Sequence, residues 1–180
     1  MRRPAIGLLV CLAAAWWVTL GARPPQIVPV GTPIQILTTS ITQACTIADT
    51  NETDLWTYTL PAGLLNTDGR GVRVTVWYTR AANGNTKTQR LYFGATVVSS
   101  HAVADSGQTL VQTATILRTS STAQLTGAFW GSGASGSIAP SITTPAETLA
   151  NAIVIKATGQ NGTAAANDIC FRVGTVEWLR

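Results

Sequence analysis

The strongest constraint on the fold is a stretch from Glu52 to Val98 in which side chains alternate in character with a period of two. A β-strand places successive side chains on opposite faces, whereas a helix would give a period of 3.6. The central segment therefore has two faces. The valine face consists of Val72, Val74, Val76 and Tyr78, and the second face consists of Arg73, Thr75, Trp77 and Thr79. We expect the valine face to pack into the core. The second face is left to contact another sheet, a partner subunit or a ligand.

Turn-forming residues divide the rest of the chain into further short strands. Asn83-Gly84 favours a type I′ hairpin, which would pair residues 72–79 with residues 90–98. Residues 99–107 are expected to form a polar loop. Other strands are predicted at residues 33–39, 43–47, 55–60, 108–118, 123–130, 151–158 and 168–179. On the last of these, Ile169, Phe171, Val173 and Thr175 should share a face. Evenly spaced short strands are typical of an all-β antiparallel sandwich or barrel.

Charge and composition narrow the class of protein. Only 11% of the 180 residues are charged, against roughly 25% in ordinary soluble domains. The net charge is +4, and the basic residues are scattered along the sequence rather than clustered. Nucleic-acid binding requires clustered Lys and Arg, so we expect no nucleic-acid partner. The composition suits extracellular and particle-forming proteins better than cytosolic enzymes.

The N-terminus divides into two segments that precede the expected domain at residues 34–180. Residues 1–22 begin with Arg2 and Arg3 and continue as a long uncharged apolar run. A cleaved signal peptide, an uncleaved membrane anchor and a segment packed against the domain all remain open. Residues 23–33 contain four prolines and should form an extended linker or arm.

Two of the three cysteines lie in the expected domain, one near each of its ends. Cys45 and Cys170 would close a very long loop if they were bonded in an oxidising compartment. The alternative is two buried free thiols that act as small hydrophobic side chains. Cys11 lies in the N-terminal apolar segment.

No catalytic, cofactor or metal site is predicted. His101 is the only histidine, and it should be a solvated loop residue without a nucleophile motif nearby. Gly131, Gly133 and Gly136 match a dinucleotide pattern, but Pro140 follows where a helix would be needed. Residues 49–54 hold three acidic side chains that could offer oxygen ligands to Ca²⁺, although their spacing fits no calcium loop.

Tryptophans are numerous for a domain of this size, and they carry the candidate interface. Exposed tryptophans stack on sugars or anchor protein interfaces, whereas buried ones fill an ordinary sandwich core. The side chains that we expect to reach a partner, and to meet at a threefold axis, are Trp77, Tyr78 and Trp130, with Arg73 beside Trp77.

The order of sequence segments resembles a group of β-sandwich proteins from tailed bacteriophages and prophages, which are described as virion structural or fibre-type proteins. The resemblance covers residues 46–179, and its most specific parts are AANGNTKTQRLYFG at residues 81–94 and the segment from Pro145 to Asp168. It implies a jelly-roll sandwich similar to tumour necrosis factor, assembled as a homotrimer, with no catalytic residues. The N-terminal apolar segment does not fit this group, since phage structural proteins are normally assembled in the cytoplasm and have no export signal.

Together these observations favour a non-enzymatic structural or interaction module of a virion or an extracellular surface. It would associate with itself, and with other virion or surface proteins or glycans. The alternative is an exported carbohydrate-binding or adhesin-like module, and a secreted hydrolase that uses His101 is a third hypothesis.

Overall fold

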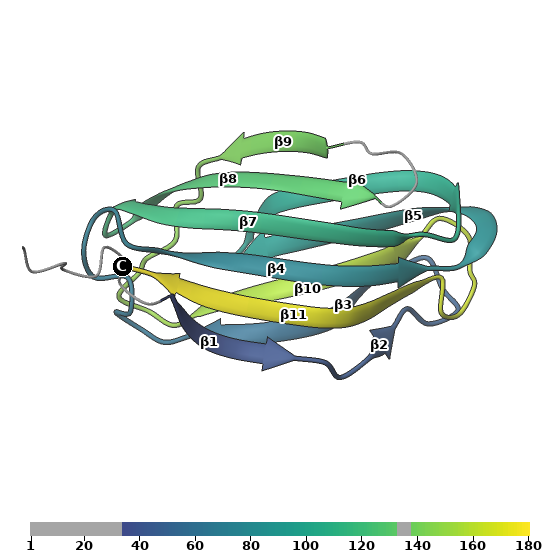
Figure 1. Cartoon of the computed structure of the whole chain (residues 1–180), viewed down its shortest axis with the longest axis horizontal. Coiled ribbons are helices and arrows are strands. Elements are labelled where there is room, and N and C mark those ends of the chain that lie inside the picture. Colours follow the sequence, from purple (N-terminus) through teal and green to yellow (C-terminus); the bar gives the residue numbers. More distant parts are fainter. Residues whose placement is uncertain (1–33, 133–137) are drawn as a thin grey trace, which may run out of the picture. The chain divides into compact units, whose positions relative to one another are not determined.

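A computed structural model describes residues 34–132 and 138–180 and arranges them as two antiparallel β-sheets packed face to face (Figure 1). The predicted segments 1–22 and 23–33, Cys11, and the glycines at 133 and 136 lie outside these residues. The strands are β1 (Gln35–Ser40), β2 (Ala44–Cys45), β3 (Glu52–Leu60), β4 (Gly71–Arg80), β5 (Ala82–Phe93), β6 (Thr96–Ser106), β7 (Thr109–Ser120), β8 (Ala123–Ser132), β9 (Ile138–Thr143), β10 (Ile153–Asn161) and β11 (Ile169–Leu179).

The strand order is that of a jelly roll. The larger sheet runs β1-β11-β4-β7-β8-β9, with β2 also paired to β11, and the smaller sheet runs β3-β10-β5-β6. Several pairs of neighbouring strands, such as β11 with β4 and β10 with β3, are distant in sequence because the chain crosses repeatedly from one sheet to the other, as in jelly rolls. Strands β8 and β9 form a hairpin extension that widens the larger sheet beyond β7. The predicted all-β antiparallel sandwich is confirmed.

The core lies between the sheets and contains the predicted valine face. Val72, Val74, Val76 and Tyr78 on β4 are fully buried. They pack in one cluster with large side chains from both sheets, including Leu91, Phe93, Ile155 and Phe171. Burying each such side chain contributes roughly 1.5–3 kcal/mol before the entropic cost of ordering is counted. The apolar core is therefore complete within one chain.

The predicted hairpin at Asn83-Gly84 is wrong. Strand β4 pairs with β7 and β11, whereas β5 pairs with β6 and β10 in the other sheet. Gly84 does have a positive φ of 70°, but it lies in a bulge where the register shifts between Ala82 and Thr86. Bulges and type I′ turns both use residues that tolerate positive φ, so the local signal does not distinguish them.

The actual hairpin lies ten residues further on, within the segment predicted as one strand. Strand β5 ends at Phe93, which pairs with Thr96 at the start of β6. The φ of Gly94 is 59°, and the φ of Ala95 is not positive. This combination is the pattern of a type II′ turn. The predicted loop at residues 99–107 is therefore wrong, because β6 continues to Ser106.

A second bulge alters the face predicted for β11. Ile169 and Phe171 are buried as expected, but the register shifts between Phe171 and Val173. Beyond this shift Val176 points into the core, and Thr175 points outward. Among the described residues, no helix is long and apolar enough to cross a membrane.

Candidate functional site

The outer face of the larger sheet is the surface that the second set of alternating side chains occupies. Cross-strand pairing aligns its residues in rows. One row runs across six strands through Ile36, Glu177, Arg73, Thr115, Gly127 and Ile142. The next row runs through Thr39, Thr175, Thr75, Thr113, Phe129 and Pro140. Since the smaller sheet packs on the opposite, valine-bearing side, this face does not meet the second sheet.

Large apolar side chains are exposed on this outer face. Ile142 is 77% exposed, and Trp77 is 44% exposed. Three more are also exposed, namely Ile36, Leu125 and Phe129. Gly127 lies between Leu125 and Phe129, and a Cβ atom built there would meet nothing within 4 Å. The face therefore combines exposed apolar side chains with open space above Gly127.

The charges on this face are largely paired. The Nε of Arg73 donates to the carboxylate of Glu177 on the neighbouring strand β11. Arg172 lies at the end of the face near β2, where it donates to Thr79 at 2.8 Å and to Gln43. Most of the remaining groups are threonines, and the hydroxyls of Thr75 and Thr113 lie 3.4 Å apart.

The structure divides the four predicted interface residues into two groups. Trp77 and Arg73 lie on the outer face, as expected. Tyr78 is fully buried in the core, where burial raises the pKa of its phenol far above the usual value, so its assignment to an interface is wrong. Trp130 is directly opposite the buried Gln112 on the inner side of the sheet, so it does not belong to the outer face either.

The outer face of the smaller sheet is built from a polar network instead. Glu52 accepts hydrogen bonds from Arg90 at 2.9 Å, from the Tyr92 hydroxyl at 2.8 Å and from Thr158. Partial burial raises the pKa of Glu52, but the hydrogen bonds from Thr158 and Tyr92 and the charge of Arg90 outweigh it and hold that pKa below the usual value. Lys156 pairs with Asp54 at 3.1 Å.

This network involves two of the three acidic residues that could have offered ligands to Ca²⁺. The third, Asp49, accepts from the backbone and side chain of Asn51. Within residues 34–132 and 138–180, no three His, Cys, Asp or Glu side chains are grouped so as to hold a metal ion.

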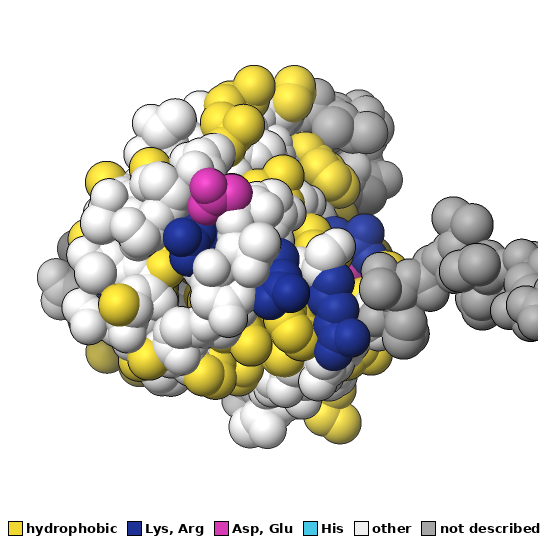
Figure 2. Space-filling model, turned by 90° about the vertical axis from the view of Figure 1, so that its left-hand side faces the viewer, with side chains coloured by type: hydrophobic (Ala, Val, Ile, Leu, Met, Phe, Trp, Pro, Cys, Tyr) yellow, Lys and Arg dark blue, Asp and Glu magenta, His cyan; other side chains and the backbone are white. Residues whose placement is uncertain are grey.

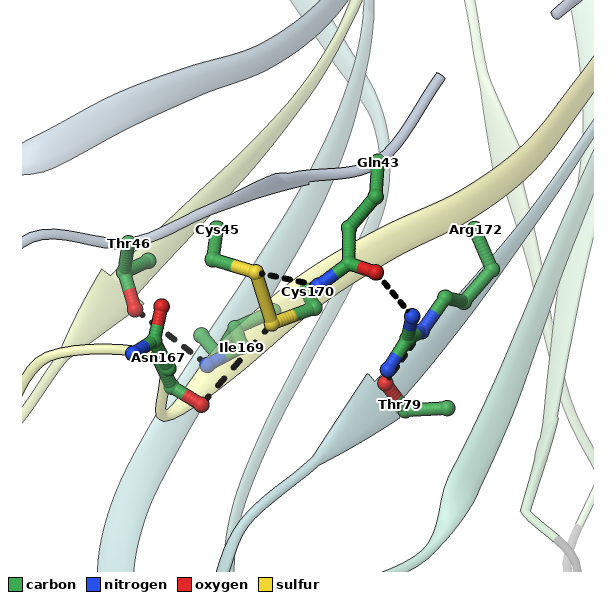
Figure 3. Close-up of a disulfide and its surroundings, with 8 residues drawn as sticks. All are labelled: Gln43, Cys45, Thr46, Thr79, Asn167, Ile169, Cys170 and Arg172. Atoms are coloured by element: carbon green, nitrogen blue, oxygen red, sulfur yellow. Dashed lines mark hydrogen bonds between the residues drawn. A yellow bond between two sulfur atoms is a disulfide. The ribbon is translucent and has the colours of Figure 1, made fainter. Parts of the chain in front are cut away.

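A disulfide joins the edge of the larger sheet to β11. Cys45 on β2 is directly opposite Cys170, and their Cα atoms lie 4.0 Å apart (Figure 3). Beside it, the Thr46 amide donates to the Ile169 carbonyl at 2.9 Å, and the Thr46 carbonyl accepts from the Asn167 amide at 2.8 Å. The hydroxyl of Thr46 accepts from the Ile169 amide at 3.2 Å. Of the two alternatives for these cysteines, the structure contains the disulfide.

The interior at one end of the sandwich is polar. His101 is only 7% exposed, and its ring is tilted against that of Trp130, with the centroids 3.8 Å apart. The prediction that His101 is a solvated loop residue is therefore wrong. Its Nδ1 lies 3.3 Å from Arg80 Nη1 and 3.4 Å from Gln89 Oε1. No nucleophilic arrangement accompanies it among these contacts.

A second buried cluster holds the bulge of β5 and was missed at the sequence level. Fully buried Lys87 donates to Asn83 Oδ1 at 2.8 Å and to the Asn85 carbonyl at 2.9 Å. Both asparagine side chains in turn donate to Asp168, which precedes β11. The three polar residues around Gly84 therefore tie the two sheets together, and they were interpreted as a turn because period-two patterns do not report bulges.

Basic side chains also gather at the end of the sandwich that carries the C-terminus (Figure 2). Arg70 and Arg180 lie over the ring of Trp178, at 5.8 and 4.5 Å from its centroid. Arg118 lies next to Arg70, and it pairs with Asp68 at 2.7 Å. The fold thus brings together arginines that are scattered in the sequence.

Comparisons with known proteins add little to this description. No family model matches the chain, and no curated protein matches it. A solved structure described as the CBM2 module of the evolved Dit of Lactobacillus casei BL23 phage J-1 is similar over 68% of each chain, with 10% identity and a TM-score of 0.38. A likeness this distant carries no argument about function.

Proposed function

We propose that the protein is a non-enzymatic structural or interaction module of a viral particle or an extracellular appendage. It associates with further copies of itself through the outer face of the larger sheet. The observation that carries this proposal is the exposure of five large apolar side chains on that one face, while the core of the sandwich is already filled. Contiguous exposed apolar patches on soluble proteins usually mark interaction sites.

A second copy of this chain is the occupant that best fits the chemistry of the face. Arg73 and Glu177 neutralise each other within one copy, so two such faces would approach without strong repulsion between like charges. The open space above Gly127 would accommodate an exposed side chain such as Phe129 or Ile142 from another copy. Interface centres are similarly poor in charge and rich in aromatic residues. The homotrimer implied by the phage resemblance is the state that we expect.

The disulfide supports a location outside the reducing cytoplasm. Disulfides form and persist on cell surfaces, on virions and in secreted proteins, and they are rare in the cytosol. A bond between Cys45 and Cys170 agrees with the export signal or anchor predicted for residues 1–22. Virion, cell surface and extracellular space are all consistent with this proposal.

Light scattering of the purified protein at micromolar concentration tests self-association. We expect a mass that is a multiple of the chain mass. A double variant, Trp77→Thr with Phe129→Thr, should shift the equilibrium toward monomer, because it removes two apolar contacts and keeps residues that suit a strand. A wild-type protein that stays monomeric across this concentration range would overturn the proposal.

A further inference from the structure

A groove lies between the edge of the smaller sheet and the extension of the larger sheet. Strand β6 is at the edge of its sheet, beside β8 and β9 (Figure 1). The groove has a volume of about 370 Å³, within the range of small-molecule sites. Its walls contain only uncharged residues, which are Val97, Val98, Ser99, Ser100, Trp130, Pro140, Ser141 and Thr143.

Buried polar groups without partners lie in the wall of this groove and behind it. The hydroxyl of Thr143 lines it, and Thr126 is directly opposite Thr143 on β8. Fully buried Gln112 donates to the Ser99 hydroxyl at 3.3 Å. The Oγ1 atoms of both threonines and the Oε1 atom of Gln112 have no hydrogen-bond partner in the described part of the chain. Of these three residues Thr143 alone lines the groove, and since buried polar groups are nearly always satisfied, its hydroxyl points to a polar molecule there.

We propose that the groove binds a neutral oligosaccharide. A sugar ring presents an apolar C–H face, which stacks on an aromatic ring such as Trp130, and a rim of hydroxyls, which both donate and accept. Ser99, Ser141 and Thr143 supply matching hydroxyls. The groove and the proposed interface are largely separate, because Trp130, Ser141 and Thr143 lie on the inner side of β8 and β9, and Pro140 alone belongs to both.

Other ligand classes fit the groove less well. An anionic ligand would find no cation in the walls, and a purely apolar one would leave the hydroxyls unpaired. An extended peptide would need the free backbone edge of β6. The Ser141 hydroxyl already lies 3.4 Å from the Val98 carbonyl on that edge.

The test is binding of the full-length protein to an array of neutral and acidic glycans, followed by calorimetry with the neutral oligosaccharide that binds best. We expect Trp130→Ala to weaken its affinity by about tenfold or more, equivalent to about 1.4 kcal/mol. Thr143→Val keeps the side-chain shape and removes the unpaired hydroxyl, so it should weaken binding severalfold without affecting folding. Trp77→Ala on the outer face is the matched control and should bind like the wild type.

Three outcomes would overturn the proposal. The first is a lack of binding to every neutral glycan, including the case in which an acidic glycan or an unstructured peptide binds instead. The second is neutral-glycan binding that Thr143→Val and a folded Trp130→Phe variant both leave unchanged. The third is loss of binding in Trp77→Ala with retention in Trp130→Ala, since the sugar would then lie on the outer face.

Discussion

The two outer faces of this sandwich are built from the same kind of strand, yet they differ in chemistry. On the smaller sheet, Glu52 and Arg90 anchor a network of ion pairs and hydrogen bonds, so polar groups there are satisfied by their own chain. On the larger sheet, Trp77, Phe129 and Ile142 are exposed, and the polar contacts described there are separate ones such as the Arg73–Glu177 pair. A face that satisfies its own polar groups gains little from a partner. A face with uncovered apolar area gains roughly 25 cal/mol for each Å² that association buries, before the cost of association.

This contrast locates the proposed function on one side of the molecule. Surface ion pairs contribute little stability, but they keep a face soluble and unsuited to tight self-contact. The larger sheet is stabilised differently, because its edge is fixed covalently by the disulfide between Cys45 and Cys170. Removing the surface ion pairs and removing the disulfide should therefore change the stability of the fold by very different amounts.

Removal of the disulfide is expected to have the largest effect. The bond closes a loop between residues 125 positions apart, for which the chain-entropy model gives up to about 5 kcal/mol. Cys45→Ala combined with Cys170→Ala should lower the urea midpoint strongly, and Cys11→Ala is the control that should leave it unchanged. An unaltered midpoint in the double variant would mean that the disulfide does not stabilise the edge of the larger sheet.

Loss of the Glu52 carboxylate should have a much smaller effect, one that depends on pH. The pKa of Glu52 in the folded protein lies below its usual value of 4.5. At pH values between these two pKa values, the unfolded chain therefore binds more protons than the folded one. The stability that the Glu52 carboxylate contributes is complete above its usual pKa of 4.5 and disappears as the pH falls through its pKa in the folded protein. Glu52→Gln should cost less than about 1 kcal/mol at neutral pH, because the pair is partly exposed. Urea unfolding at neutral pH and at about pH 3 checks this, and a difference that persists in acid would contradict the assignment.

The sequence predicted elements whose side chains alternate regularly, and it failed where the chain breaks that alternation. The valine face of β4, the paired strands β7 and β8 and the sandwich class were all accessible from the period-two pattern. The bulges near Gly84 and after Phe171 were not, because one extra residue inverts the faces without changing composition. Asn83-Gly84 and Gly94 are both glycine signals, and only long-range pairing decides which one forms the hairpin.

The candidate site was partly predictable for the same reason. Trp77 and Arg73 were assigned to the surface from their alternation with buried valines. Trp130 was misassigned because alternation gives two faces without saying which one is inner, and the decisive neighbour, Gln112, lies on another strand. The groove beside β6 could not be predicted, since Ser99 and Ser100 in its wall were assigned to a loop and the facing wall comes from strands of the other sheet.

The central claim is that the larger sheet's outer face, and not the smaller sheet's, mediates self-association. Sedimentation velocity of Gly127→Lys and Val154→Lys at micromolar concentration tests it most directly. Gly127 has open space for a side chain, and Val154 is an exposed strand residue on the smaller sheet, so both lysines should be accommodated in the fold. We expect Gly127→Lys to sediment as a monomer and Val154→Lys to sediment as the wild-type assembly. Assembly retained in Gly127→Lys and lost in Val154→Lys would contradict the account.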